Sequence, residues 1–224
     1  MHVQRTRPAA ETETRRRRLA PGERRQQIVT AAIAYFSEVG FGGGTRELAK
    51  RLGVTQPLIY RYFPSKDDLI RTVYDELYLR RWQPDWERLL TDQAVPLRER
   101  LIGFYQRYTT AVFTPEWMRI YLFAGLRGVE INHWWLHFVE QHLLRTMAIA
   151  LRAAHGLPDP VAMPITPAEL DLYWIFHGGI FYYGIRREVF RTPVHLGLDA
   201  FIAGSVDSML HGLPFTLRRL LQAA

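Results

Sequence analysis

The stretch from Gly53 to Leu69, GVTQPLIYRYFPSKDDL, brings hydrogen-bonding, basic and aromatic residues close together. The amide of Gln56 can donate and accept at once, which matches the major-groove edge of adenine. Thr55 offers a hydroxyl to a phosphate or a base, and Pro57 offers an apolar face to a thymine methyl. The chemistry that these residue types suit is the reading of DNA bases.

Two short helices joined by a tight turn must position these residues. Apolar periodicity predicts one helix over residues 45–52, and Pro57 suits the first turn of a second helix that ends near Phe63. With Thr45 as the first position, the spacing places apolar residues where two such helices touch, at Leu48, Ala49, Leu52, Val54, Ile59 and Tyr62. Gly53 falls in the turn, where a positive φ is needed. The spacing predicts a helix-turn-helix.

The rest of the chain also shows helical periodicity, and no run alternates as a strand would. A first helix is predicted from Glu23 to Val39, and Ser65 can cap a fourth that runs to about Arg81. Further helices are predicted over residues 97–113, 117–126, 131–154, 167–187 and 195–210, with a proline-rich loop before Pro167. We expect an all-α protein with a disordered arm over 1–20, a DNA-binding domain over 21–66 and a helical domain over 67–224.

The positive charge lies at one end of the 224-residue chain. Up to Lys66 there are 13 Lys and Arg against 5 Asp and Glu, whereas the remainder has 16 against 17. A near-neutral body with a basic end suits binding to the phosphate backbone, although basic surfaces also meet membranes or keep proteins in solution. The four arginines at 15–18 belong either to a solvated tail or to an arm that contacts phosphates or the minor groove.

Several classes of protein are disfavoured by composition. The chain has no cysteine, which removes disulfides, thiol nucleophiles and thiolate metal sites. It has neither the apolar run of a membrane span nor a signal peptide, so we expect a cytoplasmic protein without a membrane partner. We find no nucleophile motif, no phosphate-binding glycine loop and no convincing carboxylate pair. An enzyme with a histidine-lined helical pocket is therefore a distant alternative.

The run Ile28 to Glu76, which includes RELAKRLGVTQPLIYRYFPSKDDL, resembles the DNA-binding domain of TetR-family transcriptional regulators. The resemblance implies a homodimer that grips a palindromic operator on double-stranded DNA and is released by a small-molecule effector. It also implies DNA contacts by Tyr60, Arg61 and Tyr62, although Tyr62 also occupies a nominally buried position. Lys66 would meet a phosphate, and its place at a helix N-terminus supports that role independently.

One position departs from the family pattern. Family members often place Ser or Thr just before the second helix, where this chain has Gly44. We expect Thr45 or Arg46 to take over that phosphate contact.

The helical domain offers candidates for the dimer interface and the effector pocket. Small residues that would allow a second helix to approach are Gly178, Ala200, Gly204 and Ser208, unless they pack within one subunit. A pocket for an apolar or aromatic effector would be lined by Trp134, Phe138, Trp174, Phe181 and Tyr182, with His137 and His177 as polar anchors. Core packing is the alternative for each of these residues. His133 and His137 have a chelating spacing but lack a third ligand, so we expect no metal and no cofactor.

The function expected from these observations is that of a ligand-responsive transcriptional regulator. Repressors are commoner than activators in the family that the sequence resembles. An activator of the same family and an architectural DNA-binding protein without a pocket are the alternatives.

Overall fold

The computed structural model describes residues 20–222, and over this range it contains helices but no strand. The all-α prediction is confirmed. The predicted basic arm lies outside the described residues, except for Ala20. None of the helices within 20–222 combines the length and the apolar character that a membrane span requires.

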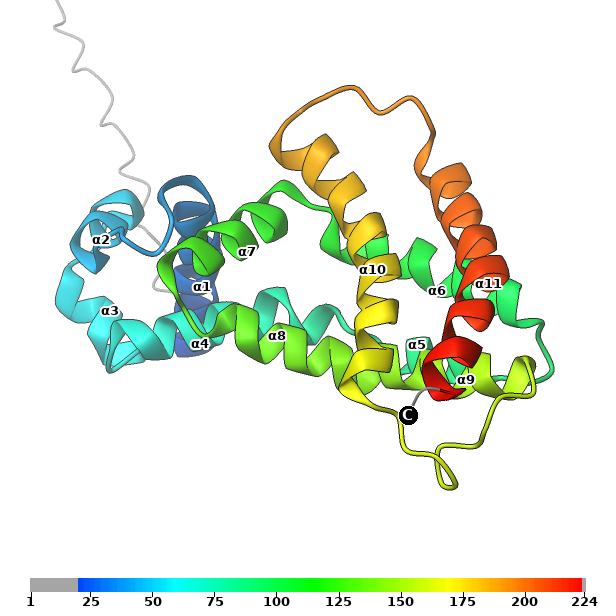
Figure 1. Ribbon diagram of the computed structural model, residues 1–224. Helices are drawn as coiled ribbons and strands as arrows, with labels where there is room; N and C mark the ends of the chain where they lie inside the picture. The colour runs from blue at the N-terminus through cyan, green and yellow to red at the C-terminus, as the bar shows by residue number, and fades with distance from the viewer. Residues whose placement is uncertain (1–19, 223–224) are drawn as a thin grey trace, which may run out of the picture.

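Four helices gather at one end of the molecule, on the left of Figure 1: α1 (Pro21–Val39), α2 (Thr45–Leu52), α3 (Gln56–Tyr62) and α4 (Lys66–Leu77). The remainder of the described chain forms a larger helical body. Its helices are α5 (Pro84–Thr91), α6 (Leu97–Val112), α7 (Pro115–Arg127), α8 (Ile131–Val139), α9 (Arg145–Ala154), α10 (Pro167–Gly184) and α11 (Leu198–Gln222). A 3₁₀ turn, η1 (Leu79–Arg81), follows α4, and the π-helical segments η2 (Glu140–Leu144) and η3 (Ile185–Val189) follow α8 and α10.

Two elements differ from the sequence prediction. Helix α5 was not predicted, and it forms with Pro84 in its first turn and with Trp86 and Leu90 buried. Helix α11 begins at Leu198 rather than His195 and continues past the predicted end at Leu210 to Gln222, although Pro214 lies inside it. Pro214 and Leu217 are both buried, so packing against the body outweighs the hydrogen bond that a proline cannot donate.

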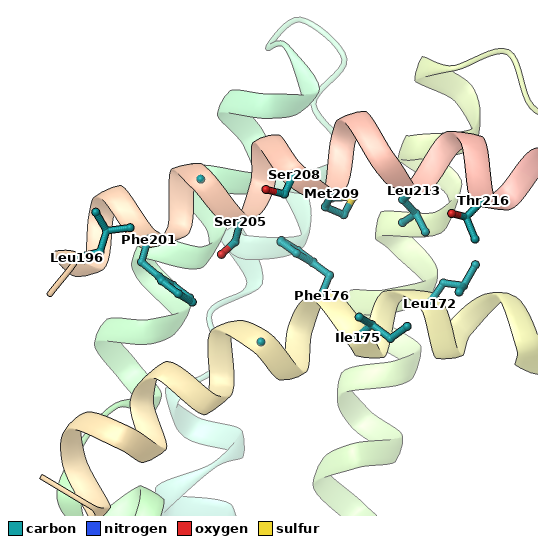
Figure 2. A pocket seen from close by; sticks show the side chains of 12 residues that line it. Leu172, Ile175, Phe176, Leu196, Phe201, Ser205, Ser208, Met209, Leu213 and Thr216 are labelled. Carbon is teal, nitrogen blue, oxygen red and sulfur yellow. The ribbon is translucent and has the colours of Figure 1, made fainter. Parts of the chain in front are cut away.

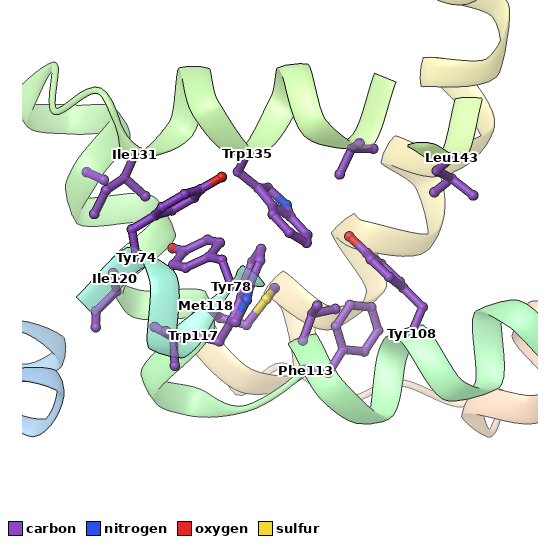
Figure 3. Close-up of a cluster of buried hydrophobic side chains, with 14 of the residues drawn as sticks. Tyr74, Tyr78, Tyr108, Phe113, Trp117, Met118, Ile120, Ile131, Trp135 and Leu143 are labelled. Carbon is purple, nitrogen blue, oxygen red and sulfur yellow. The ribbon is translucent and has the colours of Figure 1, made fainter. Parts of the chain in front are cut away.

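An aromatic cluster joins α4 to the body (Figure 3). The ring of Tyr78, directly after α4, lies 4.7 Å from that of Trp117 on α7 and 5.4 Å from that of Trp135 on α8, measured between centroids. Tyr74 lies 5.2 Å from Trp134 in the same way. Tyr78 and Trp117 are fully buried. Helix α4 is therefore packed into the body at one end while it leads into the N-terminal helices at the other.

Helix α7 also holds the N-terminal helices to the body. It packs along α1, and the Nε of Arg119 donates to the carbonyl of Ser37 at 2.5 Å. Gly40 follows the last residue of α1 and has a positive φ of 72°. A side chain at Gly40 would press on the ring of Phe123 on α7. The N-terminal helices are thus held to the body by α7 as well as by α4.

A buried ion pair links α9 to α10. The guanidinium of Arg152 on α9 makes two hydrogen bonds with the carboxylate of Glu169 on α10, with Nε 2.9 Å from Oε1. Its Nη1 also donates to the carbonyls of Pro158 and Met163, at 3.0 and 2.6 Å. Both charged side chains are at most 1% exposed. The pair therefore ties the proline-rich loop to the two helices that flank it.

Replacing Arg152 should strongly destabilise the protein. Arg152→Met leaves the buried Glu169 carboxylate without its partner, which costs about 3 to 5 kcal/mol of unfolding free energy. Urea unfolding followed by circular dichroism measures the loss. Arg98→Met is the control, because it breaks the exposed pair with Asp207 and should change stability little. Equal losses in the two variants would contradict the assignment.

Candidate nucleic-acid interface

The turn between α2 and α3 has the geometry that the sequence predicted. Gly53 adopts the left-handed conformation, with φ 63° and ψ 36°. The N–H of Val54 then donates to the carbonyl of Ala49 at 3.0 Å, which ends α2 and redirects the chain into α3. Leu48, Ala49 and Ile59 are buried between the helices, as predicted. The helix-turn-helix is confirmed.

Helix α3 presents a face to the outside. Thr55, Pro57 and Arg61 are exposed, and Tyr60 is 40% exposed. Arg46 is also exposed, at the start of α2. Tyr62 is half-buried and packs against the core, which agrees with its place at the boundary between core and surface.

Thr45 does not lie on this surface. Its side chain is buried, and its hydroxyl oxygen accepts a hydrogen bond from Nε2 of Gln56 at 2.8 Å. The same oxygen lies 3.0 Å from the hydroxyl of Tyr60. The hydroxyl of Thr45 is thus turned toward α3 and not outward, which favours Arg46 over Thr45 for the predicted phosphate contact.

The contact with Thr45 leaves Gln56 able to bind a further group. An amide nitrogen carries two hydrogens, so one N–H and the carbonyl oxygen of Gln56 remain for another partner. Because Thr45 holds the amide on α2, the side chain is ordered before any partner arrives, and less rotamer entropy is lost on binding. Sequence reasoning missed this positioning role, since Thr45 and Gln56 lie 11 residues apart on different helices.

Lys66 lies beside α3 at the start of α4. Its ammonium donates to the carbonyl of Phe41 at 2.5 Å, which leaves two of its three hydrogens for an anion. Ser65 caps α4 by accepting from the backbone N–H of Asp68 at 3.0 Å. From residue 20 to Lys66 the chain has seven basic and three acidic residues, so this end of the described structure is positively charged.

The residues predicted to line an effector pocket do not surround one of the cavities found in the described chain. Trp134 packs on Tyr74 and under the guanidinium of Arg71, whereas Phe138 stacks on His142 with centroids 4.2 Å apart. Phe181 packs on Tyr121, and Trp174 packs on His177. His137 and Tyr182 are exposed. The seven residues are divided between two helices, α8 and α10, and mostly serve separate aromatic contacts.

His177 is a buried member of this set. Its Nδ1 lies 3.1 Å from the hydroxyl of Tyr105 and its Nε2 lies 3.5 Å from that of Tyr108. Burial lowers the pKa of His177 to about 4, so the imidazole is neutral at pH 7. Both ring nitrogens therefore have neighbours within the protein. Within residues 20–222, no group of three or more His, Asp or Glu side chains could hold a metal ion.

An open groove of about 660 Å³ lies between α10 and α11 (Figure 2). Phe176, Phe201 and Met209 give it apolar walls, and Gly179, Gly204 and Ser208 line it with little side-chain bulk. Gly204 and Ser208 belong to the predicted dimer interface. The other two residues predicted for that interface, Gly178 on α10 and Ala200 on α11, are both exposed.

Comparison with known proteins finds likenesses that centre on the N-terminal helices. Residues 28–73 match the family model described as "Bacterial regulatory proteins, tetR family". The tetracycline repressor protein class A from transposon 1721 of Escherichia coli is 32% identical over 85 residues, which are 34% of this chain and 39% of that protein. The transcriptional repressor NicS of Pseudomonas putida is 33% identical over 128 residues, 55% of this chain and 56% of the relative. The chain thus spans about two fifths to just over half of these relatives.

The fold extends the likeness over most of the chain. A TetR-like transcriptional regulator from Rhodococcus sp. RHA1 superimposes with a TM-score of 0.63 at 20% identity, covering 87% of this chain and all of that one. The resemblance predicted from the helix-turn-helix residues is confirmed.

Gly53→Ala should destabilise the N-terminal helices. A side chain at Gly53 meets open space, so the cost is that of a left-handed φ alone, about 1 to 2 kcal/mol. Gly44 also faces open space, but it has an ordinary φ of −84° at the N-cap of α2. Gly44→Ser should therefore stabilise the protein by a few tenths of a kcal/mol, roughly the gain of a capping hydroxyl. Urea unfolding of both variants measures whether the unfolding free energy falls in Gly53→Ala and rises in Gly44→Ser. A Gly53→Ala protein as stable as the unmodified protein would contradict the turn geometry.

Proposed function

We propose that the protein is a transcriptional regulator that reads DNA with α3, since residues 28–73 match the TetR family model. The observation that carries the proposal is the amide of Gln56, held by Thr45 at the start of an exposed helix. An ordered amide with a free donor and a free acceptor suits the edge of adenine in the major groove.

Other residues of this surface have separate roles in the proposal. Tyr60 and Arg61 contact bases or backbone beside Gln56, and Thr55 contacts a phosphate. Lys66, already fixed by Phe41, binds a phosphate near the N-terminus of α4. Arg46 rather than Thr45 supplies the phosphate contact at the start of α2. Tyr62 stabilises α3 from the core side.

The proposed active form is a homodimer that uses the groove between α10 and α11. One recognition helix reads too few base pairs to find a site in a genome, so two copies related by a two-fold axis are needed. The exposed apolar side chains of Ile175 and Phe215 lie on these two helices and are 73% and 63% exposed. A second copy, whose α10 and α11 fill the groove, would bury them.

We further propose that the protein is a repressor that a small apolar or aromatic effector releases from DNA. The curated relatives named above are repressors, which supports this direction of regulation. An effector among the aromatic residues near His177 would act on DNA binding through α4. To turn such a switch from almost fully bound to almost fully released, it must prefer the released state by about 5.5 kcal/mol.

Gln56→Ala and Lys66→Ala should weaken DNA binding in different ways. Gln56→Ala should lose about 1 to 3 kcal/mol at one base pair of the operator and relax the preference there. Lys66→Ala should weaken all sequences alike and reduce the salt dependence by about one unit of slope. Gel-shift titrations on an operator selected from random DNA, at several salt concentrations, separate the two effects. A changed sequence preference in Lys66→Ala alone would reverse the roles.

Gly204→Trp should block the dimer without unfolding the subunit. A side chain on Gly204 meets nothing within 4 Å inside one subunit, so an indole there projects into the groove. Sedimentation equilibrium should then report a monomer. Leu126→Trp is the control, because Leu126 is 83% exposed on α7, away from the groove. A dimer that survives Gly204→Trp would exclude this face.

A further inference from the structure

A second cavity, of about 380 Å³, lies between α5, α6 and α9, at the opposite end of the molecule from α2 and α3 (Figure 1). Polar groups enter it from three segments: the end of α5, the loop that follows and the first turn of α6. Helix α9 contributes one hydroxyl and an apolar wall. The polar lining residues are Thr91, Gln93, Arg100 and Thr146, and the apolar ones are Ile149, Ala150, Ala153 and Ala154.

Arg100 is the unusual residue of this cavity. It is only 7% exposed, and among residues 20–222 no acidic side chain forms an ion pair with it. Its Nη1 donates to the carbonyl of Leu90 at 2.7 Å. Its Nε is fully buried and has no hydrogen-bond partner in the described chain. A guanidinium stays protonated in proteins, so an unpaired cation is buried here.

The contact with Leu90 does not account for the whole guanidinium. Leu90 lies in the last turn of α5, where a cation interacts favourably with the helix dipole. That contact uses one of the five donors of an arginine side chain. A buried charge is costly unless it is paired and hydrogen-bonded. The hydroxyls of Thr91 and Thr146 already donate to the carbonyls of Glu87 and His142, so the cavity's place for an anion is indicated by the remaining donors of Arg100.

We propose that this cavity binds a small organic anion, a monocarboxylate with a short apolar chain. The carboxylate pairs end-on with the Nη donors of Arg100 that Leu90 leaves free, since Nε is buried and guanidinium and carboxylate match as two parallel hydrogen bonds. The amide of Gln93 flanks it, whereas Thr91 and Thr146 only line the cavity, since their hydroxyls donate to backbone carbonyls. The chain lies along Ala150 and Ala153, toward the half-exposed Ile149 at the mouth. The volume falls within the range of about 300 to 1,000 Å³ that ligand cavities occupy.

Titration calorimetry with hexanoate tests the proposal, in a low-salt buffer and without DNA, so that the result does not depend on the proposed function. We expect saturable binding to the full chain. Arg100→Gln should weaken it by about tenfold or more, the loss that fits a charge-assisted pair. Arg107→Gln is the matched control: it removes a guanidinium from the exposed side of the same helix, and it should leave hexanoate binding unchanged.

A second variant and two comparison ligands complete the test. Ala150→Leu fills the apolar wall without touching the charge and should also weaken hexanoate by about tenfold, which keeps the test decisive if Arg100→Gln does not fold. 1-Hexanol and sulfate should each bind much more weakly than hexanoate. The proposal is overturned by no saturable binding below about 10 mM, by equal affinity in Arg100→Gln and Arg107→Gln, or by equal affinity for either comparison ligand.

Discussion

The packing of Tyr78 between Trp117 and Trp135 is the contact on which the relation between the two ends of the molecule depends. Tyr78 directly follows α4, and α4 leads out of the helix-turn-helix. The tyrosine hydroxyl and the indole N–H of Trp117 are both buried without partners in residues 20–222, and burial raises the pKa of Tyr78 well above its usual range. Large rings fill this site, and two of its polar groups are unpaired within the described chain. Because Tyr78 directly follows α4, a movement of these rings would displace the end of α4 first. Helix α3 is thus connected to the aromatic core of the body through α4.

The sequence predicted the helix-turn-helix in detail because its signals are local. A glycine that needs a positive φ and apolar residues at fixed offsets can be read within one short stretch, and Gly53, Leu48 and Ile59 lie where that reading placed them. The features that were missed depend on tertiary contacts. Helix α11 runs through Pro214 because its far end is buried, and Thr45 turns inward because Gln56 and Tyr60 meet it from another helix. Aromatic composition likewise gave no means to tell core rings such as Phe181 from residues that line a cavity.

Within residues 20–222, a single copy of the protein has two different surfaces that could each take a partner. Along α10 and α11 the surface is apolar and poor in side-chain bulk, which favours a close fit to another helical surface. Between α5, α6 and α9 the unsatisfied feature is instead a buried charge with polar neighbours, which favours a small polar ligand. Size and polarity thus separate a site suited to a macromolecular partner from one suited to a small anion.

The hydrogen bonds of Thr45 also bear on how this surface can evolve. Because one buried hydroxyl holds both Gln56 and Tyr60, a change at either of these positions leaves a polar atom of Thr45 with one partner fewer. If α3 reads bases as proposed, a change of base preference at Gln56 favours a compensating change at Thr45 on α2. Residues 45, 56 and 60 are therefore expected to covary: among descendants of this protein, their identities should change together rather than one at a time.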